Sequence, residues 1–194
     1  MRLTRETLGL LPAEMDRGWQ GPSSGHRIVH LGIGAFHRAH QAVHTQDAGD
    51  GWRITGVSLR SPEVRDALLP QDGLYTVAER FNGSAATRFV NAIDTVLVAP
   101  EDPEAVIAAL ADPQTHVVTL TVTEKGYYRH PATGSLRRDD PAIASDLNGA
   151  VPQTLYGYLA QALGRRRAAG ATGITLVSCD NLPGNGALLM SSLA

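Results

Sequence analysis

Two glycines that follow a short apolar run have the spacing of a phosphate-binding turn. Residues Ile28–Leu31 are typical of a buried strand, Gly32–Gly34 come directly after them, and a helix can follow. In such a turn the first glycine allows a tight bend, and the second lets the backbone approach a pyrophosphate beside the helix N-terminus. A complete dinucleotide fingerprint has a third glycine where this chain has His37. The motif alone leaves two interpretations open, a dinucleotide site and an ordinary strand–helix turn.

The residues after the second predicted strand bear on which dinucleotide would bind. The fingerprint has an acidic residue there that holds the adenosine ribose. In this chain the strand over residues 52–59 is followed by Arg60 and Ser61 instead. Arg60 could face the 2′-phosphate of NADP, or it could stack on an adenine or meet solvent. We therefore expect NAD or NADP as the cofactor.

Three histidines lie in the segment after the glycines. His37, His40 and His44 are spaced by three and four residues, which would place them on one face of a helix over residues 35–48. Such a row could bind a metal, but catalytic zinc sites normally take their ligands from more than one element. N–H donors are also useful at the mouth of a phosphate site. We predict no metal site here.

A second cluster of reactive side chains follows the predicted strand over residues 117–123. Residues Thr121–Tyr128 include the acid Glu124, the base Lys125 and two tyrosines. Ligands of open parallel sheets bind beyond the carboxyl ends of the strands, so these residues fall where chemistry would take place. An ordinary exposed loop is the alternative. Lys125 is the only lysine among the 17 basic residues, so any lysine base within this chain would have to be Lys125.

A third cluster, residues 178–186, follows the predicted strand over residues 174–178. Its composition is typical of a turn, but Asn181 and its neighbours could also hold a polyhydroxy ligand or a carbonyl oxygen. Cys179 is interpreted as a packing residue, because no histidine or asparagine partner is evident for a cysteine nucleophile.

The elements that would position these clusters alternate between strands and helices. This order predicts an α/β fold, with a mostly parallel sheet, helices on both faces and a small antiparallel insert. Asn82-Gly83 is the expected turn of that insert. Residues 1–26 are predicted to be a lead-in segment, residues 27–194 the domain, and residues 126–150 an irregular part of it. The predicted strands are residues 28–31, 52–59, 74–81, 87–91, 96–98, 117–123 and 174–178, and the predicted helices are residues 35–48, 61–69, 102–110, 152–169 and a last one after Pro183.

Composition excludes several classes of protein. The chain has 194 residues and a formal net charge of −2, so it lacks the basic surplus expected of a nucleic-acid partner. A single cysteine rules out an internal disulfide framework. No apolar run approaches the roughly 20 residues that span a bilayer, and the N-terminus lacks a signal-peptide pattern. We expect a soluble, cytoplasmic protein without nucleic-acid or membrane partners.

Four of these segments, in this order, resemble the mannitol dehydrogenase family of long-chain polyol dehydrogenases. They are residues 31–41, 71–75, 121–127 and 178–186. The resemblance implies a Rossmann-type N-terminal domain and a largely helical C-terminal domain. It also implies zinc-independent hydride transfer between NAD(P) and a sugar alcohol, with a ketose or ketouronate as the other substrate.

The resemblance also suggests roles for individual residues. The family's cofactor loop has phenylalanine and arginine in place of the third glycine. Asn181 is implied to support the reacting oxygen, and Glu124 matches an acid near the mouth of the active site. Together with Arg60, the expected cofactor-binding residues are Gly32, Ile33, Gly34, Ala35, Phe36 and Arg38.

The chain departs from the family in its length. It ends where the family's first domain ends, and the family's lysine base belongs to the second domain. Lys125 lies in a different motif and does not replace that base. We therefore expect this chain to bind a dinucleotide without turning over polyols alone, its partner being the C-terminal domain. A non-catalytic nucleotide-binding module for sensing or scaffolding is the alternative.

Overall fold

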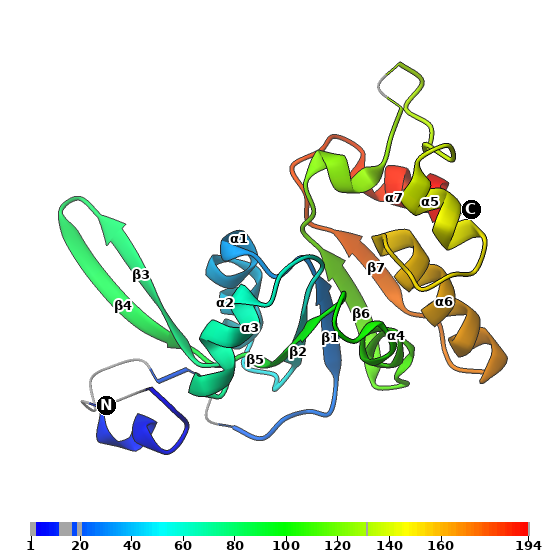
Figure 1. Cartoon of the computed structure of the whole chain (residues 1–194). Coiled ribbons are helices and arrows are strands. Elements are labelled where there is room, and N and C mark those ends of the chain that lie inside the picture. The colour runs from blue at the N-terminus through cyan, green and yellow to red at the C-terminus, as the bar shows by residue number, and fades with distance from the viewer. Residues whose placement is uncertain (1–2, 12–16, 19–20, 131, 194) are drawn as a thin grey trace.

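The structure is a computed structural model that describes residues 3–11, 17–18, 21–130 and 132–193. Parts of the predicted lead-in, residues 1–2, 12–16 and 19–20, lie outside the described residues. The strands are β1 (Arg27–Leu31), β2 (Arg53–Ser58), β3 (Tyr75–Phe81), β4 (Ser84–Val90), β5 (Ile93–Val98), β6 (Thr115–Leu120) and β7 (Thr175–Ser178). Five of them form a parallel sheet in the order β5-β2-β1-β6-β7, and β3 pairs with β4 in a separate antiparallel hairpin (Figure 1).

Helices cover both faces of the parallel sheet, as the strand–helix alternation predicts. The α-helices are α1 (Ala35–Ala39), α2 (Gln41–Asp47), α3 (Glu63–Leu68), α4 (Pro103–Ala111), α5 (Pro141–Leu147), α6 (Leu155–Ala168) and α7 (Asn185–Leu193). Short 3₁₀ helices are η1 (Thr7–Leu10), η2 (Leu69–Gln71) and η3 (Glu124–Tyr127). Buried side chains of α2 and α3 pack on one face, and those of α4, α5, α6 and α7 pack on the other. None of the helices in the described part of the chain is long and apolar enough to cross a membrane.

The order of the strands places a crevice beside β1. From β1 the chain runs outward through β2 to β5, and then crosses to the other side of β1 for β6 and β7 (Figure 1). The chain therefore leaves β1 toward β2 on one side and leaves β6 toward β7 on the other. Because β1 and β6 are neighbours, a gap opens between the two connections. At such a topological switch point, open parallel sheets bind ligands at the carboxyl ends of the strands.

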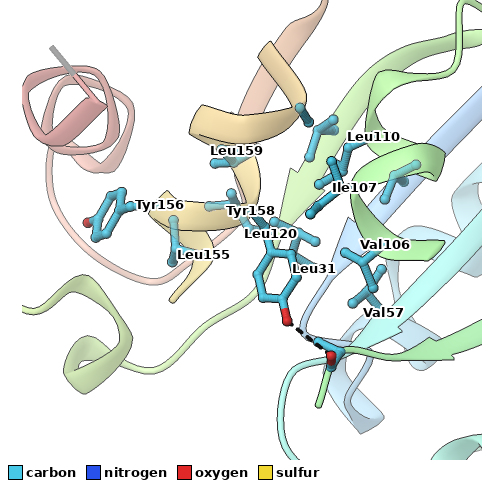
Figure 2. Packing of buried hydrophobic residues seen from close by; sticks show 14 of the residues in the cluster. Leu31, Val57, Val106, Ile107, Leu110, Leu120, Leu155, Tyr156, Tyr158 and Leu159 are labelled. Atoms are coloured by element: carbon cyan, nitrogen blue, oxygen red, sulfur yellow. Dashed lines mark hydrogen bonds between the residues drawn. The ribbon is translucent and has the colours of Figure 1, made fainter. Parts of the chain in front are cut away.

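The larger hydrophobic core holds β1 and β6 against α4 and α6. Leu31, Leu120 and Leu159 are fully buried in it. Figure 2 shows Tyr158 of α6 among these side chains, with its Oη donating a hydrogen bond of 3.0 Å to the carbonyl oxygen of Ala99. Each fully buried leucine contributes on the order of 2 kcal/mol through removal of apolar surface from water. This core keeps the carboxyl ends of β1 and β6 side by side.

The antiparallel insert projects from the body of the protein (Figure 1). Asn82 and Gly83 both have positive φ, as a type I′ turn requires, which confirms the turn predicted from the sequence. At the base of the hairpin, Leu8 of η1 packs against Leu74 and Phe89. Part of the lead-in therefore covers the hairpin base.

The predicted single helix over residues 35–48 is wrong. It is divided into α1 and α2 at His40, whose φ of −123° and ψ of −82° are not helical. The break lets His37 of α1 turn inward beside β1, while α2 directs Ala42 and Val43 toward the sheet. A straight helix would not bury both sets of side chains.

The prediction of an irregular segment over residues 126–150 is also wrong in part, because α5 lies within it. Asp140 caps this helix by accepting a backbone N–H of its first turn, and Pro141 occupies the first helical position. The same pair, Asp102 and Pro103, begins α4, where the helix is predicted correctly. The signal of an acidic N-cap followed by proline was therefore present at both places.

We predict that Asp140→Ala lowers the free energy of unfolding by about 1 kcal/mol, because the N-cap bond of α5 is lost. Asp139→Ala is the matched control: Asp139 is exposed and precedes the cap, so its change should stay within about 0.5 kcal/mol. Urea unfolding of both variants measures the difference. Equal losses in the two variants would contradict the capping role.

Candidate functional site

A pocket of about 460 Å³ opens at the carboxyl ends of β1, β2 and β6. Its walls are the turn at residues 32–34, residues 58–60 at the end of β2, the loop after β6 and residues 153–155 at the start of α6. The pocket therefore lies at the topological switch point, where the fold predicts a ligand.

Gly32 makes a turn that a side chain would prevent. Its φ is +95°, and a Cβ atom placed on it would lie 2.2 Å from the carbonyl oxygen of Thr121. Its N–H donates a hydrogen bond of 2.9 Å to the carbonyl oxygen of Val57. The turn is thus held between the end of β2 and the loop after β6.

Gly34 lies at the opposite end of this turn and faces open space. Its φ of −94° and ψ of −174° are extended, and a Cβ atom placed on it would be 3.8 Å from its nearest protein neighbour, the carbonyl oxygen of Gly32. No side chain caps the first turn of α1, which begins at the next residue. The backbone at Gly34 can therefore be approached closely by a ligand, as the role of the second glycine requires.

A buried histidine supports the glycine turn from below. His30 of β1 is fully buried, its Nδ1 is 2.7 Å from Oγ1 of Thr119, and its Nε2 is 2.9 Å from Oγ1 of Thr121. Thr121 in turn donates a hydrogen bond of 2.9 Å to the carbonyl oxygen of Gly32. The imidazole therefore joins β1, β6 and the glycine turn.

A second buried imidazole stacks on the first. The ring centroids of His30 and His37 are 3.5 Å apart. Burial, reinforced by the neighbouring His37, lowers the pKa of His30 to about 2. Burial likewise lowers the pKa of His37 to about 4. Both rings are therefore uncharged at neutral pH.

Four of the residues predicted to bind the cofactor line the pocket: Gly32, Ile33, Gly34 and Arg60. The side chain of Ile33 is buried and lies so close to Gly56 of β2 that a Cβ atom there would be 2.1 Å from it. Ile33 thus anchors the turn on β2, and the glycines on either side face the pocket.

The other three predicted residues, which follow in the same loop and in α1, do not line this pocket. Ala35 is exposed at the start of α1. Phe36 is also exposed and stacks on His40. The guanidinium of Arg38 donates a hydrogen bond of 3.4 Å to the carbonyl oxygen of Ile33, so its contact is with the loop backbone.

The segment after β2 presents an arginine and no carboxylate. Oγ of Ser58 donates a hydrogen bond of 2.6 Å to the carbonyl oxygen of Ser61, which closes a turn around Arg60. Arg60 is exposed at the pocket wall. Among the described residues that line the pocket there is no aspartate or glutamate.

Glu124 and Asn181, the two residues expected near the reacting atoms, lie on the loops after β6 and β7. Both are exposed, and neither is among the residues that line the pocket. The pocket wall beside Glu124 consists of its neighbours Thr123 and Gly126. Cys179 is half-buried and lines a second pocket, and burial, with the neighbouring Asp180, raises the pKa of its thiol.

The pocket wall at the start of α6 is not evident from the sequence. Thr154 lines the pocket and caps α6. Asp146 of α5 accepts hydrogen bonds from the backbone N–H of Thr154 at 3.0 Å and from its Oγ1 at 2.6 Å. The N-cap pattern could have predicted Thr154, but its position at the pocket depends on a helix that was not predicted.

The three histidines after the glycines line the same second pocket as Cys179, although the helix that bears them is broken at His40. His37 is fully buried, His40 lies at the break between α1 and α2, and His44 is exposed. Within the described part of the chain, no three His, Cys, Asp or Glu side chains are grouped so that they could hold a metal ion.

A parallel sheet with a glycine turn and a pocket at its switch point defines a Rossmann-type dinucleotide-binding domain. Residues 26–194 match the family described as the Mannitol dehydrogenase Rossmann domain. The chain belongs to this family.

Similar proteins agree with this assignment. The chain is 47% identical to mannitol dehydrogenase 2 of Saccharomyces cerevisiae over 178 residues, which cover 86% of this chain and 35% of that protein. It is 46% identical to the mannitol 2-dehydrogenase of Pyrenophora tritici-repentis over 167 residues, 82% of this chain and 30% of that protein. The chain therefore spans about a third of the length of these relatives.

Solved structures show the same fold. The mannitol 2-dehydrogenase of Pseudomonas fluorescens, solved as a ternary complex with NAD and D-mannitol, superposes with a TM-score of 0.91 and is 36% identical, covering all of this chain and 41% of that chain. A D-sorbitol dehydrogenase in substrate-free form gives a TM-score of 0.89 and 36% identity, covering 98% of this chain and 42% of that chain.

We predict that the free energy of unfolding decreases as the pH is lowered below about 6.5, because of the two stacked histidines. Both pKa values are lower in the folded chain than the ordinary value of 6.5, so the unfolded chain binds more protons below that pH. The loss should amount to about 1.4 kcal/mol per pH unit for each histidine, continuing toward pH 4 for His37 and lower for His30. Unfolding in urea between pH 7 and pH 4.5 measures it.

The matched controls are two histidine-to-glutamine substitutions. His37→Gln should flatten the pH dependence by about one proton, whereas His44→Gln, which removes an exposed imidazole outside the stacked pair, is the control. If both variants keep the full slope, the stacked pair is not its source.

Proposed function

We propose that this chain is the NAD(P)-binding domain of an oxidoreductase that interconverts a polyol or aldonate with a ketose or ketouronate. The observation that carries the proposal is the open backbone at Gly34 beside the pocket at the switch point. The family and the solved complex of a relative with NAD and D-mannitol support it.

The pocket residues fit a dinucleotide laid across the ends of the strands. The turn at residues 32–34 would hold the pyrophosphate, since Gly34 leaves room for it. Residues 58–60, after β2, occupy the position where Rossmann domains hold the adenosine ribose. The nicotinamide end would then lie toward the loops after β6 and β7.

The roles of the two loops follow from this orientation. The nicotinamide ring supplies the hydride acceptor or donor when it is bound. The amide of Asn181 would donate a hydrogen bond to the alkoxide oxygen that forms at the reacting carbon. Glu124 would stand near the mouth of the site. The general base would be a lysine that lies outside this chain.

The substrate and the location of the protein are part of the same proposal. A sugar alcohol, ketose or ketouronate would be held between this domain and a helical second domain. The relatives are about three times as long as this chain, which leaves room for such a domain in them. We therefore expect this chain alone to bind cofactor without oxidising polyols. We place the protein in the cytoplasm.

The first test compares two substitutions with opposite expected effects on cofactor binding. Gly34→Val should abolish NADH binding, because the β-branched side chain fills the space beside the backbone that a pyrophosphate would occupy. Asn181→Ala should leave NADH binding nearly unchanged and lower the rate of an intact enzyme by about 10²–10³. Titration of NADH followed by fluorescence measures both affinities.

Folding controls make this test decisive. Gly34→Val should keep its native stability because φ at this position is extended, whereas Gly32→Ala should lose about 1–3 kcal/mol through its left-handed φ alone. If a folded Gly34→Val variant binds NADH normally, the cofactor site is elsewhere. If Asn181→Ala binds NADH as poorly as Gly34→Val does, Asn181 contacts the cofactor or stabilises the fold, and its proposed role at the reacting oxygen is wrong.

The second test concerns the choice between NAD and NADP. No carboxylate lines the described pocket to repel a 2′-phosphate, and Arg60 is exposed at its wall. We expect Arg60→Ala to raise the Kd of NADPH about tenfold and that of NADH less than threefold. Arg80→Ala, an exposed arginine on the hairpin, is the control and should change neither. Equal effects of Arg60→Ala on both cofactors would contradict a contact with the 2′-phosphate.

A further inference from the structure

The carboxylate of Asp180 joins the loops at the ends of β6 and β7. Its Oδ1 accepts a hydrogen bond of 2.6 Å from the backbone N–H of Val122. Its Oδ2 accepts a hydrogen bond of 2.5 Å from Oη of Tyr127 and one of 3.0 Å from Oγ of Ser178. Val122 and Tyr127 belong to the loop after β6, whereas Ser178 ends β7. One side chain therefore ties the two loops together.

The Tyr127 side of this connection is firmly held. Tyr127 is fully buried, and Oη of Tyr156 in α6 donates a hydrogen bond of 3.1 Å to its carbonyl oxygen. Burial, together with the hydrogen bond to Asp180, raises the pKa of the Tyr127 phenol above its usual range, so it remains a hydrogen-bond donor. The contact between Tyr127 and Asp180 is thus a hydrogen bond from a neutral phenol to a carboxylate.

The Asp180 side is held through its backbone. Nδ2 of Asn185 donates hydrogen bonds of 3.2 Å and 2.8 Å to the carbonyl oxygens of Ser178 and Asp180. The N–H of Leu182 donates a hydrogen bond of 2.9 Å to the carbonyl oxygen of Asp180. Residues 180–182 therefore form a tight turn, with Asn181 exposed at its apex.

The same connection shapes the pocket. Val122, Gly126 and Tyr128 line it and lie in the loop that Asp180 holds. Glu124 lies in that loop too, and Asn181 directly follows Asp180 in the chain. A shift of the Asp180 carboxylate would therefore move both exposed residues and one wall of the pocket.

We propose that Asp180 is a positioning residue, which sets Asn181 and the loop bearing Glu124 around the nicotinamide end of the bound cofactor. This inference rests on the proposed function. The physical basis is preorganisation: donors that are already fixed before binding need no rearrangement during the reaction. Asp180 itself touches neither cofactor nor substrate in this role.

The experiment compares NADH with ADP-ribose, which lacks the nicotinamide, on the 194-residue chain. Asp180→Asn keeps the size of the side chain but replaces one acceptor oxygen with an NH₂ group that faces donors. We expect it to raise the Kd of NADH about tenfold through the pocket wall formed by the loop after β6, since loss of the Asn181 side chain alone should leave NADH binding nearly unchanged. The Kd of ADP-ribose should change less than twofold, as should both values for the exposed control Asp139→Asn. If Asp180 served only to stabilise the fold, Asp180→Asn would raise the Kd values of NADH and ADP-ribose by the same factor.

A second variant and a second measurement separate positioning from folding. Tyr127→Phe removes the contacts of the hydroxyl with Oδ2 of Asp180 and Oγ of Ser178 without changing the packing. It should raise the Kd of NADH by a smaller factor than Asp180→Asn does, again with little change for ADP-ribose. Amide hydrogen exchange of Val122 should accelerate in Asp180→Asn, because a single amide oxygen remains for the donors that the two carboxylate oxygens serve, with β1 and β2 still protected. If Asp180→Asn loses hydrogen-exchange protection throughout the chain, the variant is unfolded. The Kd values of NADH and ADP-ribose for Tyr127→Phe then test the positioning role.

The outcomes distinguish this inference from the proposed function. Equal weakening of both ligands, or unchanged NADH binding in Asp180→Asn and Tyr127→Phe, overturns the positioning role and leaves the cofactor site intact. A wild-type chain that binds neither ligand overturns the proposed function, and the positioning role falls with it.

Discussion

The left-handed turn at Gly32 is the constraint on which the rest of the site depends. The chain has to leave β1 between two neighbouring strands, and a Cβ atom at this point would lie 2.2 Å from the carbonyl oxygen of Thr121. Only glycine can occupy a place where backbone meets backbone so closely with φ of +95°. The N–H of Gly32 then bonds to β2 while its carbonyl oxygen bonds to Thr121. The turn thereby links three adjacent strands at their carboxyl ends, and the pocket opens where they separate.

Much of the fold follows from local patterns that the sequence displays plainly. The parallel sheet, the hairpin with its Asn82-Gly83 turn and the helix begun by Asp102 and Pro103 are all expected from residue types and spacing. The errors arise where tertiary contacts override the local pattern. The spacing of the histidines suggests one helix, but burial of His37 against His30 requires a break at His40. The helix α5 carries the same signal in Asp140 and Pro141, but the turn-forming residues around it favour an irregular segment.

Only those residues of the candidate site that are close to one another in the sequence can be predicted from it. The glycine turn could be found because its residues are consecutive and follow an apolar strand. Other parts depend on contacts across the sheet that no spacing records. His30 lies inside an apolar strand, and its partners Thr119 and Thr121 are about ninety residues away. Asp180 was noted in a turn-like motif, but its bond to Val122 joins residues 58 positions apart. The sequence indicates which loops carry the proposed catalytic residues, but not what holds those loops.

Buried groups hold this site and exposed groups carry its proposed chemistry. This explains why the reactive residues are evident from the sequence and the residues that support them are not. The residues that hold the site, among them His30 and Tyr127, are fully buried and keep their rings neutral. The residues proposed to act on a substrate, Asn181 and Glu124, are exposed on short turns. Exposed amides and carboxylates on loops gain a defined direction only from the frame beneath them, since their own side chains have little to pack against. The chemistry proposed for this domain therefore depends less on its exposed reactive residues than on the hydrogen-bonded frame that fixes the three loops around the pocket.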